Sequence, residues 1–296
     1  MSQVGSPSSG VKISIDLPTI DGASLKRIGI KVLVMIPVAL LLFGAFFFGA
    51  SNIEQARSQH MLLEKFAIQL PTGTVGQLNA PIGLGTPVAL LELPSLGVRQ
   101  VVVEGASPDD LKAGPGHLPV SSLPGEVGNV VILGRHAGYG GPFRNIAHMQ
   151  IGDKIVVTTG QGVYAYDVTG VTPAPREQTS FFQPTIDSTL TLVSSASSSP
   201  WSDRIAVTAK LEGAPLGIPS RPISVIGDSA LGTSGDPLGY PLAFAWGVLL
   251  VIAIAGARKL YRRWTSLAAY LVSAPVVLLL IWMTCENVAR VLPGTV

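Results

Sequence analysis

The stretch that decides the fold is residues 128–143, GNVVILGRHAGYGGPF. It opens with an apolar run, Val130–Leu133, between two glycines, and it ends in a glycine-rich turn that leads to Phe143. A short run rich in β-branched residues and bounded by glycine is typical of a buried strand. We therefore expect a strand here, followed by a loop that carries Arg135 and His136.

Runs of the same kind lie on both sides of this stretch, each bounded by Pro, Gly or other turn residues. Two of them flank Gly160-Gln161-Gly162, which predicts a hairpin. The predicted strands are Val88–Leu93, Gln100–Val103, Val130–Leu133, Lys154–Thr159, Val163–Val168, Thr189–Ser194 and Arg204–Leu211. Many short strands with one or two small helices favour a mainly β domain, a closed or nearly closed barrel.

Three helical segments are expected around these strands. Ser107-Pro108-Asp109-Asp110 combines a capping serine, a proline at the first helical position and acidic residues in the first turn. Phe143–Met149 is expected to form a second short helix. Ser51–Leu70 spaces apolar residues among charges, which predicts a helical stalk in front of the barrel.

Three apolar runs are long enough to cross a bilayer as helices, which takes roughly 20 residues. They are residues 32–50, 240–257 and 267–285, and none contains a charged side chain. Charged residues make up only 13% of the chain and the net charge is +2. This composition indicates a membrane protein and argues against nucleic acid as a partner, because no basic patch is present.

The placement of Lys and Arg predicts the orientation. Lys26, Arg27 and Lys31 precede the first run, and Arg258, Lys259, Arg262 and Arg263 lie between the second and third. Short loops rich in these residues stay in the cytoplasm. We therefore expect a multi-pass protein of the cell membrane whose main domain is extracellular.

The organisation expected from these features has nine parts. They are a cytoplasmic tail (1–31), a first span (32–50), an extracellular stalk helix and linker (51–84), the β-barrel domain (85–212), a linker (213–239), a second span (240–257), a basic cytoplasmic loop (258–266), a third span (267–285) and an extracellular tail (286–296).

Several motifs in the barrel region occur in a set order. They are Gly114-Pro115-Gly116-His117, Leu123-Pro124-Gly125, Gly128-Asn129-Val130-Val131, Gly134-Arg135-His136 with Tyr139-Gly140-Gly141-Pro142-Phe143, Gly152-Asp153-Lys154-Ile155, Thr191-Leu192-Val193-Ser194-Ser195, and Arg204. In this order they resemble the sortase family, the cysteine transpeptidases of Gram-positive cell surfaces, in a form similar to the class E homologues of actinobacteria. The resemblance covers roughly residues 85–212 and implies a sortase-like closed β-barrel.

The departures from the family pattern fall on the catalytic positions. The resemblance implies a cysteine at position 195 and a histidine at position 135, where this chain has Ser195 and Arg135; histidine stands one place later, at His136, and Arg204 keeps the position of the family's active-site arginine. The chain's one cysteine is Cys285, in the third apolar run. Neighbouring side chains on an extended backbone point to opposite faces, so we expect His136 to point away from the site.

These substitutions weaken the chemistry that the resemblance implies. A thiol has an unperturbed pKa of about 8.5, whereas a serine hydroxyl needs a well-placed general base. The favoured hypothesis is a catalytically inactive pseudo-sortase that binds a peptide or surface protein in a cell-surface assembly, with other membrane subunits as candidate partners. In that reading Ser195 is a small polar residue at a strand end. The alternative is an active sortase-type transpeptidase, acyl transferase or peptidase that uses Ser195, His136 and Arg204.

A binding groove is the second hypothesis for the site. The guanidinium groups of Arg135 and Arg204 would both approach it and bind a carboxylate or another anion. His117, Tyr139 and Phe143 are further candidates, against the alternatives of a structural turn residue for His117 and core packing for the two aromatics. The four histidines lack metal-ligand spacing and no acidic cluster is visible, so we expect no metal and no cofactor.

Overall fold

The computed structural model describes residues 39, 41–71, 82–216, 235–263 and 266–295. Residues 43–296 form one compact unit, and residues 1–42 are a separate one. Of the first predicted span, residues 32–38 and 40 lie outside the described residues. Residues 41–45 are helical and continue into the π-helix η1, Phe46–Ala50.

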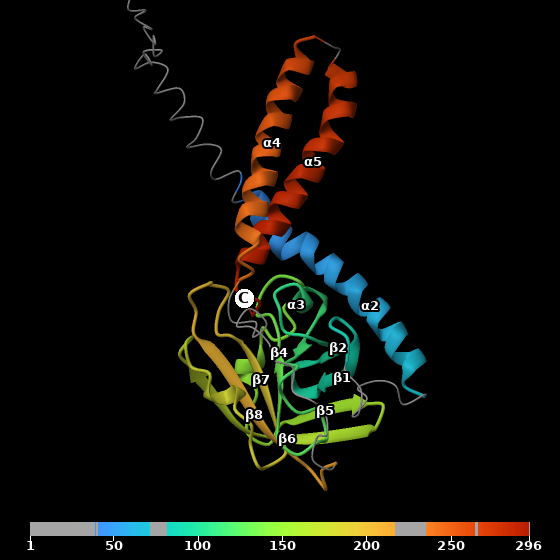
Figure 1. The fold of residues 1–296 in the computed structure, drawn as a ribbon, viewed down its shortest axis with the longest axis vertical. Helices are drawn as coiled ribbons and strands as arrows, with labels where there is room; N and C mark the ends of the chain where they lie inside the picture. Colours follow the sequence, from blue (N-terminus) through green and yellow to red (C-terminus); the bar gives the residue numbers. More distant parts are fainter. Residues whose placement is uncertain (1–38, 40, 72–81, 217–234, 264–265, 296) are drawn as a thin grey trace, which may run out of the picture. The chain divides into compact units, whose positions relative to one another are not determined.

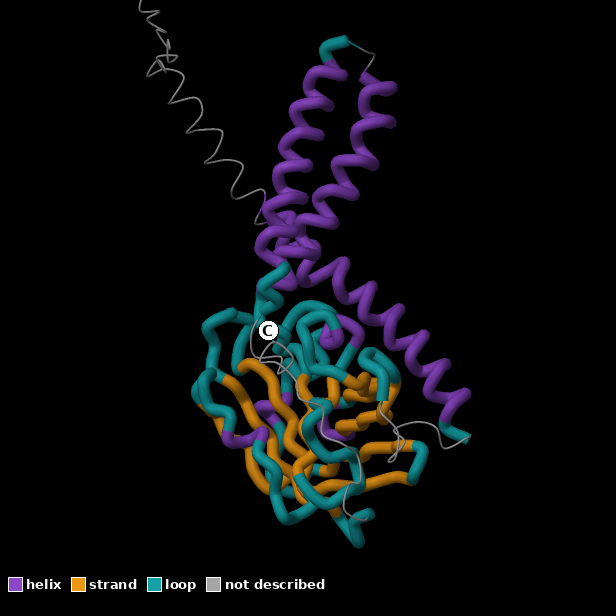
Figure 2. Tube along the Cα trace, in the orientation of Figure 1, coloured by secondary structure: helices purple, strands orange, loops and turns teal. Residues whose placement is uncertain are grey.

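Eight strands close into a barrel in the order β1-β2-β3-β4-β7-β8-β6-β5. Figures 1 and 2 show the strands gathered in one domain with loops around them. The strands are β1 (Pro87–Leu93), β2 (Val98–Glu104), β3 (Gly116–His117), β4 (Asn129–Leu133), β5 (Lys154–Thr159), β6 (Gly162–Ala174), β7 (Thr189–Ser195) and β8 (Arg204–Leu211). The β2–β3 and β4–β7 pairs are parallel, and the others are antiparallel. The prediction of a closed, mainly β domain is confirmed.

Every predicted strand is present, and the structure adds β3. This strand of two residues joins β2 to β4, and it was missed because two residues show no periodicity. The barrel interior is filled by apolar side chains that alternate along the strands. Its fully or nearly buried members include Leu91, Leu93, Ile132, Ile155, Tyr166, Leu192 and Val207.

Short helices lie in the loops between the strands. They are η2 (Pro94–Leu96), α3 (Asp110–Ala113), η3 (Ile146–His148) and η4 (Ser180–Phe182). Helix α3 begins at Asp110 with Asp109 as its N-cap, two residues later than predicted. Ser107 still contacts its first turn, since the Asp110 amide donates to Ser107 Oγ at 3.2 Å and the Ser107 hydroxyl donates to Asp110 Oδ2 at 2.6 Å. The helix expected over Phe143–Met149 is only the three-residue η3.

The expected stalk is the helix α2, Ser51–Gln69, and it lies along the barrel (Figure 1). Leu62 and Phe66 pack against Leu90, Val101 and Val103 of strands β1 and β2. The Gln59 amide donates to the carbonyl of Val101 at 3.0 Å, and its oxygen accepts from the Val101 amide at 2.8 Å. The helix that was predicted as a stalk therefore packs against strands β1 and β2 of the barrel.

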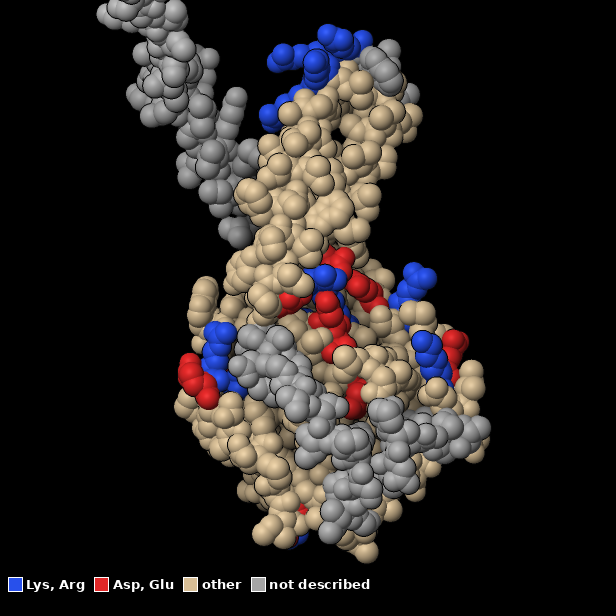
Figure 3. All heavy atoms as spheres, viewed as in Figure 1, with Lys and Arg blue, Asp and Glu red and all other residues tan. Residues whose placement is uncertain are grey.

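Two described helices are long and apolar enough to cross a membrane. They are α4, Gly239–Tyr261, and α5, Ser266–Val291. They pack against each other and leave apolar side chains such as Phe244, Val251, Leu271 and Leu278 exposed. In Figure 3 the surface of this hairpin carries Lys and Arg near its loop and is otherwise largely uncharged. Exposed apolar surface of this extent marks a membrane or protein interface.

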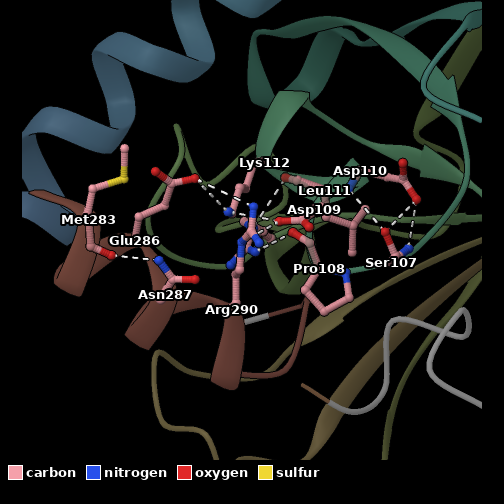
Figure 4. A network of polar contacts seen from close by, with 11 residues as sticks. Ser107, Pro108, Asp109, Asp110, Leu111, Lys112, Met283, Glu286, Asn287 and Arg290 are labelled. Atoms are coloured by element: carbon pink, nitrogen blue, oxygen red, sulfur yellow. Dashed lines mark hydrogen bonds and ion pairs between the residues drawn. The ribbon is translucent and has the colours of Figure 1, made fainter. Parts of the chain in front are cut away.

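Helix α5 continues beyond the predicted span and ends at Val291 rather than at Cys285. The extra turns carry an ion network with α3 (Figure 4). Lys112 Nζ lies 2.9 Å from Asp109 Oδ1 and 3.4 Å from Glu286 Oε1, and Arg290 Nε lies 3.2 Å from Asp109 Oδ1. The segment expected to be an extracellular tail is therefore a helix end that contacts the barrel.

Candidate functional site

The candidate site lies where β4 and β7 end. The two strands run parallel, with Leu133 opposite Val193, so their carboxyl ends meet at one end of the barrel. Strand β8 begins there as well, and its Arg204 is paired directly with Ser195. This topology brings together residues 134–143, Ser195 and Arg204, which lie far apart in the sequence.

Ser195 is buried at this end of the barrel, and Thr295 is its neighbour. The Ser195 hydroxyl lies 3.1 Å from the Thr295 hydroxyl, and the Ser195 amide donates to the Thr295 carbonyl at 3.4 Å. The His136 amide donates to the same carbonyl at 2.9 Å. Ser195, at the position where the resemblance implies a cysteine, is therefore covered by the segment that follows α5.

The side chain of His136 also reaches Ser195, although not through the hydroxyl. Burial lowers the pKa of His136, a hydrogen bond to the Ser195 backbone opposes this shift, and the charge of Arg144 adds to it. The expectation that His136 points away is wrong, because β4 ends at Leu133 and strand alternation stops there. The imidazole is thus beside the site and neutral at neutral pH.

Arg135, at the position where the resemblance implies histidine, is fully buried. Its Nε donates to the Leu111 carbonyl at 3.2 Å, its Nη2 donates to the Pro108 carbonyl at 2.9 Å, and the guanidinium stacks on the Tyr139 ring. Burial lowers its pKa to about 10, so it stays protonated at neutral pH. The hypothesis of two arginines in one anion groove does not hold for Arg135, whose guanidinium binds carbonyls of α3 and of the loop before it instead.

Arg204 keeps its place beside the site. Its side chain is largely buried, and Nη1 lies 3.4 Å from the Gln178 carbonyl that accepts its proton. Burial lowers its pKa, the charge of Arg176 adds to this effect, and Glu177 opposes it. Of the candidate catalytic residues, Ser195, His136 and Arg204 are thus brought together.

The other groove candidates are core residues. Phe143 is fully buried in the barrel core, and Tyr139 is fully buried against Phe46, Phe47 and Ala137. His117 is also fully buried, with Nδ1 2.7 Å from Glu104 Oε2 and Nε2 2.9 Å from the Ser122 carbonyl oxygen. Core packing therefore describes Tyr139 and Phe143, whereas His117 is a buried residue of strand β3 and not the turn residue of the alternative.

Thr295 is the site residue that sequence reasoning missed. It lies 100 positions after Ser195, beyond the third apolar run, and no motif of the barrel includes it. Glu104, the partner of His117, was also missed, because no motif includes it and it meets His117 only when β3 pairs with β2. No sequence signal connects either residue to the site.

An eight-stranded closed barrel with parallel β4 and β7 strands, and with positions 135, 195 and 204 gathered at their ends, defines a barrel of the sortase type. Residues 91–212 match the family model described as the Sortase domain. The barrel region of the chain is therefore a sortase-family domain.

Relatives in classes D and E are similar to this chain. Sortase D of Bacillus subtilis is 28% identical over 96 residues, which cover 32% of this chain and 47% of that protein. The chain thus spans about half the length of this curated relative. Among solved structures, a sortase D5 transpeptidase of Clostridium perfringens is 28% identical with a TM-score of 0.48, and the match covers 53% of this chain and 99% of that one. Sortase E of Streptomyces avermitilis is 28% identical with a TM-score of 0.41, and the match covers 44% of this chain and 91% of that one.

Proposed function

We propose that this chain is a membrane-anchored sortase homologue whose barrel binds a peptide or protein partner and no longer catalyses transpeptidation. The observation that carries the proposal is the pairing of the Ser195 hydroxyl with the Thr295 hydroxyl, at 3.1 Å, while the residue at the histidine position is a buried arginine.

The chemistry of the three groups supports inactivity. A serine attacks a carbonyl only when a general base accepts its proton within about 2.6–3.2 Å. A guanidinium has no acceptor atom, so Arg135 cannot take this role. The His136 imidazole is hydrogen-bonded to the Ser195 backbone rather than to its hydroxyl. Two of the three catalytic groups of the family are therefore altered in identity or engaged elsewhere.

The backbone at the same place supports peptide binding. The amides of His136 and Ser195 point at one carbonyl oxygen, at 2.9 and 3.4 Å. Two main-chain donors that converge in this way can bind the carbonyl oxygen of a peptide. A peptide or surface protein is accordingly the proposed partner, and other membrane subunits are further candidates.

The test incubates the full chain in detergent micelles with labelled surface peptides and measures its intact mass. We expect no covalent adduct. The positive control is the triple variant Ser195→Cys, Arg135→His, His136→Arg, whose folding is verified by circular dichroism. An adduct on Ser195 of the unaltered chain would end the proposal.

An acyl transferase or peptidase is the second candidate, favoured by one observation: His136 and Arg204 both flank Ser195. A side-chain rotation of His136 would bring its ring toward the hydroxyl. A fluorophosphonate probe separates the two candidates, because it labels only activated serines. Labelling that disappears in Ser195→Ala and His136→Gln, but persists in Ser199→Ala, would establish the enzyme.

For the membrane part we propose three spans, with residues 51–239 outside the cell and the loop 258–266 in the cytoplasm. The uncharged hairpin of α4 and α5 and the basic residues at its loop support this topology. In a Cys285→Ala background, an impermeant maleimide should label Ser197→Cys in intact cells and Ser6→Cys only after permeabilisation. Labelling of position 6 in intact cells would contradict the topology.

A further inference from the structure

The segment that follows α5, Leu292–Thr295, enters the end of the barrel. Pro293, Gly294 and Thr295 are buried, and Thr295 is only 2% exposed. Leu292 packs against the cluster that contains Phe47, Ala137 and Tyr139. The backbone polar groups of a buried segment outside helices and strands need hydrogen-bond partners, so the burial of Thr295 requires partners in the barrel.

Those partners are the groups of the candidate site. The Thr295 carbonyl accepts from the amides of His136 and Ser195, and the Thr295 hydroxyl lies 3.1 Å from that of Ser195. One residue of the segment thus contacts the ends of both β4 and β7 through backbone and side chain. Two backbone donors converging on one carbonyl oxygen are a specific receptor for a peptide carbonyl.

The same segment is held from its other side by α5. Arg290 and Glu286 join the ion network with Asp109 and Lys112, and the Arg290 carbonyl accepts from the Asp236 amide. These contacts keep the helix end next to the barrel. A ligand tethered in this way has a high effective concentration at its site.

We infer that Leu292–Thr295 of this same chain occupies the proposed peptide-binding site at the ends of β4 and β7. The inference rests on the proposed function and names the peptide that the site holds. A peptide from a partner must displace this segment before it binds.

Displacement has a measurable cost. If the site is free for only a fraction of the time, the affinity for an added peptide falls by that fraction, so a site open for about one tenth of the time binds about tenfold more weakly. Substitutions that expel the segment should restore the full affinity without changing the site.

The first experiment tests the occupancy itself. Ser195→Cys and Thr295→Cys are combined in a Cys285→Ser background of the full chain, in lipid nanodiscs, and mildly oxidised. We expect a disulfide between positions 195 and 295, found by peptide mass spectrometry, because the two hydroxyls are in contact. The matched control combines Thr295→Cys with Ser199→Cys, at an exposed serine, and should not close. Failure of the 195–295 pair to close overturns the inference.

The second experiment measures binding of a fluorescent peptide with the sequence of residues 287–295, NVARVLPGT. Thr295→Arg places a large cation where Thr295 is buried and should expel the segment, and we expect it to bind the peptide about tenfold more tightly than the unaltered chain. Val288→Ala, on the exposed side of α5, is the control and should leave the affinity unchanged. Equal affinity in Thr295→Arg and the unaltered chain overturns the inference.

The two experiments separate the inference from the proposed function. A closed disulfide together with no peptide binding in any variant overturns peptide binding as the function and supports the contact between the segment and the site. Peptide binding with no disulfide supports the function and overturns the occupancy by Leu292–Thr295.

Discussion

The guanidinium carbon of Arg135 lies 4.9 Å from the centre of the Tyr139 ring, in a part of the barrel where both side chains are fully buried. The same guanidinium donates to the carbonyls of Pro108 and Leu111. Tyr139 itself adopts a positive φ of 41°, which is unusual for a residue with a side chain. The Arg135 side chain therefore links α3 and the loop before it to the turn after β4.

Arg135→Ala should destabilise the barrel by about 3 kcal/mol. A hydrogen bond to a charged group contributes roughly 1.5–3 kcal/mol, and a buried cation–π contact about 2 kcal/mol, although these terms are not fully additive. Urea unfolding of the full chain in detergent micelles, followed by near-ultraviolet circular dichroism, measures the change. Arg99→Ala, at an exposed arginine paired with Glu92, is the control and should change stability by less than about 1 kcal/mol.

Gly134→Ala should cost at least about 2 kcal/mol, because a Cβ at position 134 would lie 2.4 Å from Phe143 Cδ2 in the fully packed core. The same unfolding measurement applies. Gly83→Ala is a matched control: its nearest neighbour would be Thr86 Cγ2 at 3.5 Å, an ordinary contact. Equal stability of the two variants would show that Phe143 moves aside at no cost.

His117→Leu should destabilise the chain by about 1–3 kcal/mol, because it removes one partner of a buried hydrogen-bonded pair. The pair is His117 with Glu104, and both side chains are almost completely buried. His60→Leu is the control, since His60 is exposed on α2 and its pairing with Glu64 at 3.7 Å is at the surface. A loss below about 1 kcal/mol in His117→Leu would mean that Glu104 has sufficient other partners.

Stability should fall when the pH is lowered from 7.5 to 5.5, in part through His136. Its folded-state pKa is lowered by burial from the ordinary value of 6.5, so the unfolded chain binds the proton more readily. The stability that neutral His136 contributes is thus fully present above the pKa that its imidazole has in the unfolded chain. It is lost as the pH falls toward the lower pKa of the folded chain. His136→Gln should show a smaller fall than the unaltered chain over the same range. An identical fall would assign the effect to other groups.

The contact between α5 and the barrel is testable with a double-mutant cycle. Lys112→Met and Glu286→Gln remove the two sides of a pair whose side chains are 9% and 22% exposed. We expect a coupling energy of about 1 kcal/mol, above the value for most surface pairs. Lys210→Met with Asp187→Asn is the matched cycle at an exposed pair, and its coupling should be below about 0.5 kcal/mol. Equal coupling in both cycles would contradict a special role for the α5 network.

Strand patterns and local caps were predictable because their causes are local. Alternation and bounding glycines located the strands that became β1, β2 and β4 to β8, and the Ser107-Pro108-Asp109-Asp110 motif predicted a helix in the place of α3, which begins at Asp110. The positions of Ser195 and Arg204 in the site were also predictable. Ser195 ends strand β7, Arg204 begins strand β8, and the order of the motifs implies that these two strands are neighbours. Local rules were sufficient where backbone geometry depends on adjacent residues.

The side-chain directions in the loop after β4 were not predictable in this way. The alternation rule placed His136 away from the site, but the rule ends with the strand at Leu133, and the turn that follows brings the ring to Ser195. Burial of Arg135 was missed because its carbonyl partners belong to a loop more than 20 residues earlier, a distance that no periodicity spans.

The sequence by itself determined a mainly β barrel, two described membrane-length helices and a serine hydroxyl rather than a thiol at position 195, since composition, periodicity and residue identity are sufficient for each. Only the tertiary structure decided that Thr295 covers Ser195 and that α5 ends against α3. Those contacts join residues 100 and 174 positions apart. Their formation depends on how the closed barrel and the helical hairpin pack, which is a property of the whole fold and of no single segment.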